Sequence, residues 1–252
     1  MPLTVTAING IPEVSPGDDL ATLIATASNA QHLTITSDDV IVVAHKVISK
    51  AEGRIRHLGD VEPSSRAIEL ANALNKDPRR VQVVLDESRE VLRASHGPLI
   101  TVTRHGFVCA NAGVDASNVP GDDALVLLPQ DPDESARNLR ARLKQLISED
   151  PAVLITDSFG RAWRHGQVDV AIGCAGLNPL EDWRGRPDKD GRELRATWIA
   201  VADELAAAAD LARTKDGSLP VILISGAGRH VTPDDGPGAA PIIRPESQNL
   251  FR

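Results

Sequence analysis

The sequence has no tyrosine and only three phenylalanines and three tryptophans in 252 residues. Aromatic platforms for stacking nucleobases are therefore scarce, and a net charge of −8 disfavours a general binder of nucleic acid or anionic membranes. A signal peptide and an apolar run long enough to span a bilayer are both missing. The two cysteines, Cys109 and Cys174, lie among small and apolar residues. We expect them to be reduced, buried thiols of a cytoplasmic protein.

Familiar motifs of nucleotide-binding and hydrolytic enzymes are also absent. The chain contains no GxxxxGKS/T phosphate loop and no GxGxxG between a strand and a helix. It likewise lacks GxSxG, HExxH and paired CxxC motifs, which disfavours a serine hydrolase, a zinc protease of that type and a zinc ribbon. Any phosphate or metal chemistry must therefore rest on oxygen donors and cations scattered along the chain.

Residues 153–173 are the most informative stretch. They begin as an apolar run typical of a buried strand and become polar at Asp157 and Ser158. Adjacent carboxylate and hydroxyl oxygens suit Mg²⁺ or Mn²⁺. We expect the cationic residues that follow to lie near the anion that the metal carries: Arg161, Arg164 and His165. The alternative is that Asp157 or Ser158 only caps a helix that begins there.

Two further segments carry candidate ligands. The β-branched run of residues 40–50 predicts a buried strand that delivers His45 and Lys50 to a site, where a lysine suits a nucleotide phosphate. The alternative is that its lysines are solvated charges at a strand end. The loop of residues 113–118 combines glycine with Asp115, a hydroxyl and Asn118. It suits a phosphate or a metal, or is an ordinary turn.

Periodicity and turn residues predict the remaining elements. Helices are expected after Asp18 and Asp19 and over residues 62–75, 131–147 and 192–213, the last being the longest. Strands are expected over residues 3–8, 81–85, 125–128 and 220–224, with a hairpin around residues 104–106. The charged stretch 178–191 predicts either a mobile flap over the site or a long surface connection.

The order of these elements indicates a fold class. Strands, hairpins and helices follow one another without the regular alternation of a doubly wound sheet. We predict an α+β fold, with a mixed or antiparallel sheet and flanking helices in two intimate lobes, rather than a Rossmann or P-loop fold. Residues 1–252 are expected to form a single domain.

The residues alone predict Mg²⁺- or Mn²⁺-dependent handling of a phosphorylated small molecule. A divalent-metal-dependent phosphoesterase or phosphotransferase fits this pattern. A non-catalytic nucleotide-binding module fits it as well. Neither nucleic acid nor a membrane is an expected partner.

Several ordered segments match one known family: GIPEVSPGDDL at 10–20, HKVISKAEGR at 45–54, NAGVDASNV at 111–119, ITDSFGRAWRHGQVDVAIGCAGL at 155–177 and DELAAAADL at 203–211. The tail IIRPESQNLFR agrees with it too. On these segments, which cover nearly the whole chain, the sequence resembles the coenzyme F420-0:L-glutamate ligase family, the gamma-glutamyl ligases of deazaflavin coenzyme biosynthesis. Some relatives carry an additional nitroreductase-like flavin domain, and we expect this chain to be the stand-alone ligase form.

The resemblance implies a reaction. GTP would phosphorylate the terminal carboxylate of F420-0, and the amino group of L-glutamate would attack the acyl phosphate. Further rounds would add γ-linked glutamates. The resemblance also implies two divalent ions, Mg²⁺ or Mn²⁺, and a homodimer.

The resemblance assigns roles to individual residues. It places guanine-nucleotide contacts on seven of them: Ile11, Pro12, Glu13, Val14, His45, Lys50 and Asn118. His45 stands where many relatives have Ser or Thr. Asp115 and Asp157 match ligands of a first metal, and Ser158 matches a ligand of a second. Lys50 and Asp157 are the expected catalytic residues.

The stretch before Pro220 departs from the family pattern and leaves the remaining ligand of the second metal open. Thr214 and Asp216 are candidates for that position.

Overall fold

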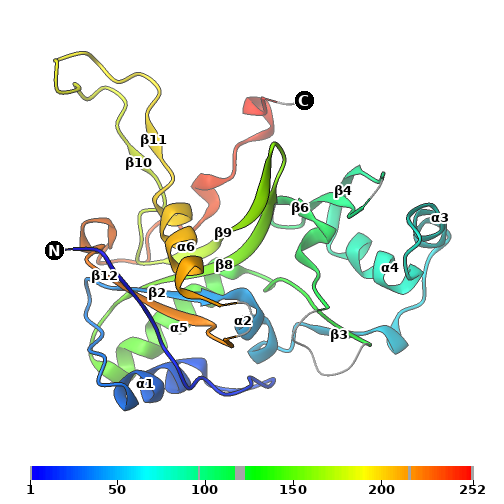
Figure 1. Ribbon diagram of the computed structural model, residues 1–252, viewed down its shortest axis with the longest axis horizontal. Coiled ribbons are helices and arrows are strands. Elements are labelled where there is room, and N and C mark those ends of the chain that lie inside the picture. Colours follow the sequence, from blue (N-terminus) through cyan, green and yellow to red (C-terminus); the bar gives the residue numbers. More distant parts are fainter. Residues whose placement is uncertain (1, 96, 117–122, 215–216, 251–252) are drawn as a thin grey trace.

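The computed structural model describes residues 2–95, 97–116, 123–214 and 217–250. Its main body is a five-stranded sheet of order β1-β12-β2-β8-β9 (Figure 1). The strands are β1 (Thr4–Ala7), β12 (Val221–Ser225), β2 (Val40–Ala44), β8 (Ala152–Arg161) and β9 (Arg164–Ala175). Strands from opposite ends of the chain are thus neighbours in one sheet.

The register of this sheet determines which residues lie side by side at the end of β2. β2 and β8 run parallel, whereas the other neighbouring pairs are antiparallel, so the sheet is mixed as predicted. Ala44, the last residue of β2, lies opposite Thr156. Helix α2 (His45–Ala51) begins immediately afterwards, while β8 continues into Asp157. The register therefore brings the start of α2 beside the polar part of β8.

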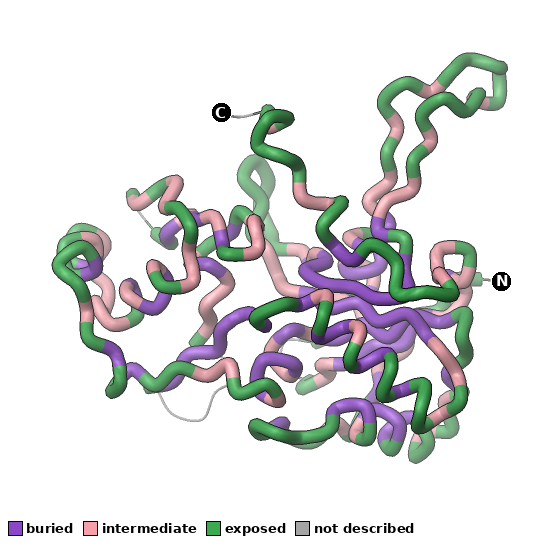
Figure 2. Tube along the Cα trace, turned by 180° about the vertical axis from the view of Figure 1, so that it is seen from behind, coloured by how far each residue is buried: buried purple, intermediate pink, exposed green. Residues whose placement is uncertain are grey.

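Both faces of the sheet are covered. Alternate residues of β2 point to opposite faces, as a strand requires. Ile41 and Val43 pack with α1 (Leu20–Ala30) and α5 (Pro132–Ile147). Val40 and Val42 pack on the other face with α6 (Val201–Ala212). Figure 2 shows the resulting buried centre, which consists mainly of aliphatic side chains, as the composition predicts.

A smaller lobe lies beside the sheet (Figure 1). It contains α3 (Ser65–Leu74), α4 (Pro78–Asp86) and an antiparallel sheet of β4 (Ser88–Arg93), β5 (Ile100–Thr103) and β6 (Val108–Ala110). β3 (Ile55–His57) pairs with β7 (Ala124–Val126). Short 3-10 helices lie at Leu58–Asp60, Asn111–Gly113, Gly228–His230, Ala240–Ile242 and Glu246–Gln248. The predicted α+β class with two lobes is confirmed.

Residues 179–200 form an arm that projects from the main body (Figures 1 and 2). β10 (Glu181–Asp182) pairs with β11 (Trp198–Ile199) at its base, and an isolated bridge joins Pro187 to Glu193 further out. The predicted helix over 192–213 is therefore wrong in its first part, because residues 193–199 turn back to pair with the outgoing strand. With that part lost, α6 has 12 residues and is shorter than α5, which has 16.

Two stretches rich in β-branched residues are helical rather than extended. Residues 45–51 form α2, and the predicted strand at 81–85 lies inside α4. Asp77 caps α4 by accepting a hydrogen bond from a backbone N–H in its first turn. Val81 and Val84 then share one face and pack into the core of the small lobe, which a strand would not allow. Capping and packing override β propensity here.

The polar part of residues 153–173 is extended, so the helix-cap alternative for Asp157 and Ser158 is wrong. β8 runs on to Arg161 and turns back through β9 in a long hairpin. Arg164, His165 and Trp163, which is 75% exposed, lie near the turn of this hairpin. Within the described residues, no helix combines the length and apolar character needed to cross a membrane.

Candidate active site

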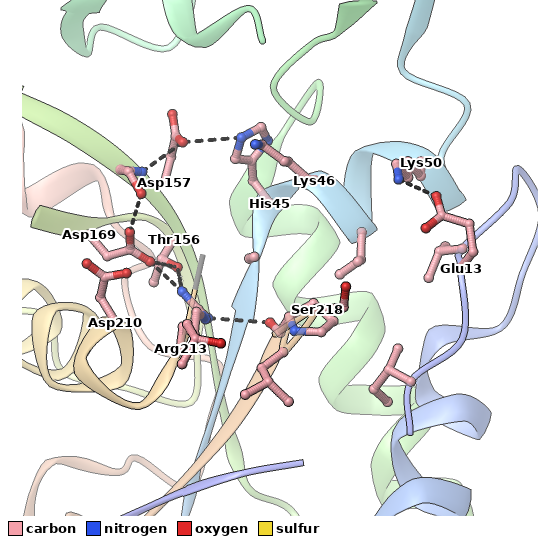
Figure 3. A pocket seen from close by; sticks show the side chains of 18 of the residues that line it. Glu13, His45, Lys46, Lys50, Thr156, Asp157, Asp169, Asp210, Arg213 and Ser218 are labelled. Atoms are coloured by element: carbon pink, nitrogen blue, oxygen red, sulfur yellow. Dashed lines mark hydrogen bonds and ion pairs between the residues drawn. The ribbon is translucent and has the colours of Figure 1, made fainter. Parts of the chain in front are cut away.

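A cavity of about 480 Å³ opens at the end of β2 (Figure 3). Its walls come from the loop before α1, from α2, from the β8–β9 hairpin and from the segment between α6 and β12. Nine residues singled out in the sequence line it together: Ile11, Pro12, Glu13, Val14, His45, Lys50, Asp157, Ser158 and Thr214. Among its described lining residues, none comes from the arm or from the hairpin tip. The arm is thus a surface extension, and the expectation that Arg161, Arg164 and His165 lie at the site is wrong.

His45 and Asp157 face each other because of the β2–β8 register. His45 Nε2 lies 3.2 Å from Asp157 Oδ1, and the two side chains are 2% and 15% exposed. The approach lacks the alignment of a hydrogen bond, so this nitrogen has no hydrogen-bond partner among the described residues. The other ring nitrogen, Nδ1, lies 3.4 Å from Ser49 Oγ, one helical turn further along α2. Asp157 Oδ1 accepts a hydrogen bond from the backbone N–H of Ser158 at 2.8 Å.

Asp169 is the centre of a buried polar network. Ser158 Oγ donates to its Oδ1 at 2.6 Å, and Thr156 Oγ1 donates to its Oδ2 at 2.9 Å. Arg213 Nη1 forms an ion pair with Oδ2 as well and donates to Thr156 Oγ1. Arg213 also reaches the backbone carbonyls of Val42 and Pro220. Burial lowers the pKa of the Arg213 guanidinium, and the nearby carboxylates, chiefly Asp169, oppose that shift.

Lys50 lies on the opposite wall (Figure 3). It is 5% exposed and forms an ion pair with Glu13, whose side chain is 68% exposed. The alternative that Lys50 is a solvated strand-end charge is therefore wrong, because the residue is helical and buried. Lys50 is therefore held by its buried surroundings, whereas most of the Glu13 side chain is in contact with solvent.

Asp115 lies next to this site rather than in its lining. Its backbone bridges to Val126, and its Oδ2 forms an ion pair with Lys46 Nζ at 2.6 Å. Lys46 itself lines the cavity, so α2 connects Asp115 to the site. The predicted nucleotide contact Asn118 lies outside the described residues, as does Asp216. Thr214 lines the cavity.

Sequence reasoning missed the pairing of Asp169 with Arg213, and it did not single out Thr156 or Asp210. The β8–β9 register carries the one usable signal, since a hairpin that turns near Trp163 places Ser158 opposite Asp169. Within the described part of the chain, no three Asp, Glu, His or Cys side chains gather as metal ligands. A metal here would therefore need hydroxyl, substrate or water oxygens in addition to carboxylates.

The two cysteines are free and buried, as predicted. Burial raises the pKa of each thiol to about 12, with further contributions from Asp157 for Cys109 and from Asp133 for Cys174. A thiol with so high a pKa is a poor nucleophile at neutral pH. Both cysteines are packing residues.

Comparison with known proteins identifies the family. A family model described as F420-0:Gamma-glutamyl ligase matches residues 10–226. The chain is 43% identical over 254 aligned positions to Coenzyme F420:L-glutamate ligase from Methanothermobacter thermautotrophicus, with all of both chains covered. The protein of that name from Methanopyrus kandleri is 45% identical over 242 positions, which cover 95% of this chain and 94% of that relative. The corresponding protein from Haloarcula marismortui is 43% identical over 258 positions, covering 99% and 96%. The resemblance read from the sequence is thus confirmed, and the chain belongs to the F420-0:gamma-glutamyl ligase family.

Proposed function

We propose that this protein joins L-glutamate to F420-0 in coenzyme F420 biosynthesis, with GTP as the phosphoryl donor. Family membership supports the ligase activity. The observation that carries the assignment to this cavity is the convergence of oxygen donors and buried cations on it. Asp157 and Ser158 lie on one wall and Lys50 on the other, with room between them for polar ligands.

In the proposed reaction the γ-phosphoryl group of GTP passes to the terminal carboxylate of F420-0, which gives an acyl phosphate and GDP. The amino group of glutamate then attacks the acyl carbon, phosphate leaves, and the nitrogen loses a proton to form the amide. Repeated attack on the γ-carboxylate extends the tail. Both steps concentrate negative charge around the transferred phosphoryl group.

Lys50 and the segment 11–14 are the proposed nucleotide-binding elements, together with Asn118. Lys50 is held in place by burial, whereas its partner Glu13 is largely exposed. A nucleotide phosphate can take the place of Glu13, because it supplies the negative charge that buried Lys50 requires while the exposed Glu13 carboxylate returns to water. Lys50 would then provide a fixed positive charge at the phosphates.

The charges around the cavity fit divalent metal. Each lysine and arginine of the described lining already has a carboxylate partner: Lys46 with Asp115, Lys50 with Glu13 and Arg213 with Asp169. Asp157 and Asp210 add further negative charge to the lining. Asp115, Asp157 and Ser158 would hold two Mg²⁺ or Mn²⁺ ions. Such ions supply the positive charge that offsets the phosphate oxygens during transfer.

Mass spectrometry of the product tests this proposal. Purified protein is incubated with F420-0, L-glutamate, GTP and Mg²⁺ or Mn²⁺, with ATP substituted in parallel. We expect mass additions in glutamate steps with GTP. No addition, while a ligase of known activity extends the same substrate, would overturn the proposal. Glutamate-independent release of phosphate from a small phosphorylated metabolite would favour a phosphoesterase or phosphotransferase instead.

We also propose that the protein acts as a cytoplasmic homodimer. The free, buried cysteines support a reducing compartment. Light scattering coupled to size exclusion gives the mass in solution, and a monomer at micromolar concentration would contradict the dimer.

A further inference from the structure

His45 presents an unsatisfied nitrogen to the cavity. The residue is 2% exposed, and its Nε2 has no hydrogen-bond partner among the described residues. Buried polar atoms are almost always paired, so an unpaired one next to a cavity indicates a ligand that completes it. The charged atom that faces it is Asp157 Oδ1, which lies 3.2 Å away without the alignment of a hydrogen bond.

The distance between His45 Nε2 and Asp157 Oδ1 is close to the distance between neighbouring ligand atoms of one metal ion. Two donor atoms bound at about 2.1 Å and at a right angle lie about 3.0 Å apart. His45 Nε2 and Asp157 Oδ1 come close to this separation. The register of β2 and β8 sets their approach, since Ala44 and Thr156 are paired immediately before them. The backbone thus holds both donors before any ion arrives.

The other ring nitrogen of His45 supports the same role. Nδ1 lies 3.4 Å from Ser49 Oγ, at the outer limit of a hydrogen bond. A histidine that binds a metal through one nitrogen commonly donates the hydrogen on the other nitrogen to a neighbouring oxygen. With its hydrogen on Nδ1, His45 directs the lone pair of Nε2 toward Asp157.

We propose that His45 Nε2 is a ligand of the divalent ion held by Asp157, and that this site prefers Mn²⁺ to Mg²⁺. The proposal rests on the metal dependence proposed above. Mg²⁺ takes oxygen ligands almost exclusively, whereas first-row transition ions accept imidazole nitrogen readily. A nitrogen beside a carboxylate therefore shifts selectivity toward Mn²⁺.

Pulsed electron paramagnetic resonance tests this directly. Mn²⁺ is added to the wild-type protein without nucleotide or substrate, and the echo envelope is examined for modulation by a coordinated ¹⁴N nucleus. Labelling histidine with ¹⁵N must replace that modulation with the ¹⁵N pattern. His45 is the one histidine in the described lining of the cavity, so the label identifies it.

Variants give the second measurement. His45→Gln is expected to lose the modulation and to raise the Kd for Mn²⁺ by at least about tenfold. Its Kd for Mg²⁺ should change less than about twofold, because Mg²⁺ gains little from imidazole. His105→Gln is the matched control, since His105 also has a buried unpaired nitrogen but lies in the β5–β6 turn, outside the cavity lining. It should keep the modulation.

The outcomes are distinct. Bound Mn²⁺ without nitrogen modulation, or modulation that survives in a folded His45→Gln variant, overturns the role of His45 and leaves the metal site standing. If the variant does not fold, the labelled wild-type spectrum decides. No bound Mn²⁺ overturns both this proposal and the metal dependence above, while mass spectrometry scores glutamate addition separately.

Discussion

Two of the arginine–aspartate pairs among the described residues have similar contacts and opposite surroundings. In the cavity, Arg213 and Asp169 are 10% and 4% exposed. In the arm, Arg184 and Asp182 are 47% and 48% exposed and joined by two hydrogen bonds of 2.9 and 2.7 Å. The guanidinium of Arg184 also stacks over Trp198. Measured by contacts alone, the arm pair is as well formed as the cavity pair.

The difference between the pairs lies in what happens when one partner is lost. Water solvates an exposed charge that loses its partner, so such pairs contribute little to stability. A buried charge that loses its partner has no such compensation. Hydrogen bonds from Arg184 lower the pKa of Asp182, yet the pair stays in contact with solvent. Burial, more than contact geometry, therefore decides which pair matters, and four substitutions test this.

The largest effect is expected for Asp157→Asn in the cavity. The change removes the negative charge of the proposed metal ligand while leaving the shape of the side chain, so the fold should persist. We expect kcat for glutamate addition to fall by at least about 100-fold, as for the loss of a group that offsets transition-state charge. The measurement is steady-state kinetics at limiting Mn²⁺, with Asp182→Asn in the arm as control. Unchanged kinetics would refute the assignment of Asp157.

Asp169→Ala should produce the largest loss of stability. It leaves Arg213 buried without its carboxylate and removes the acceptor of two hydroxyl groups. The expected decrease in the free energy of unfolding is about 3–5 kcal/mol, measured by urea denaturation. Replacing Arg213 by Met in the same variant should restore part of the lost free energy of unfolding. If Asp169→Ala alone lowers the free energy of unfolding by less than about 1 kcal/mol, water reaches the buried pair.

Asp203 of α6 is partly buried, between the buried cavity pair and the exposed arm pair. Its carboxyl group makes the stability of the fold depend on pH. Burial raises its pKa, and the backbone N–H of Ala171, which donates to it, opposes this shift. Because the folded pKa exceeds the unfolded one, this group stabilises the fold below the ordinary value of 3.8 and loses that contribution as the pH rises through the folded value. Asp203→Asn should therefore raise the urea midpoint at pH 7 and not below pH 3.8. A gain of equal size at both pH values would contradict the burial argument.

The smallest effect is expected for Arg184→Ala in the arm. Both the ion pair and the stacking on Trp198 are lost, yet every group involved is already in contact with water. The urea midpoint and kcat should match those of the wild type within error. A decrease comparable to that of Asp169→Ala would remove the distinction between the two pairs.

The fold could be predicted where local signals agreed. Asp19 and Asp131 cap α1 and α5 as their sequences indicate, and the β5–β6 hairpin turns where glycine allows it. Prediction failed at α4, where valines favour a strand in isolation but share one packed face in a helix. Prediction also failed in the arm, because Leu194 and Trp198 continue the apolar helical spacing of α6 although their backbone pairs with residues that precede it in the arm.

Site residues at the ends of helices and strands could be predicted from the sequence, whereas site contacts made by tertiary packing could not. Asp157, Ser158 and Lys50 were found because polar residues directly follow or interrupt apolar runs. Arg213 was not, since it meets Asp169 only through the packing of α6 against the hairpin, 44 positions apart in sequence. Such a contact depends on tertiary structure, which no local pattern specifies.

The sheet order also governs when the protein can first bind a ligand during its synthesis. β1 pairs with β12, with Thr4 opposite Ser225, and the cavity takes walls from both the loop before α1 and the segment before β12. Contacts between positions so far apart form slowly, because the intervening chain must be closed into a loop first. A nascent chain on the ribosome therefore cannot assemble the cavity until β12 has emerged. A ligand of this cavity can stabilise the finished fold, but it cannot guide the early steps of folding.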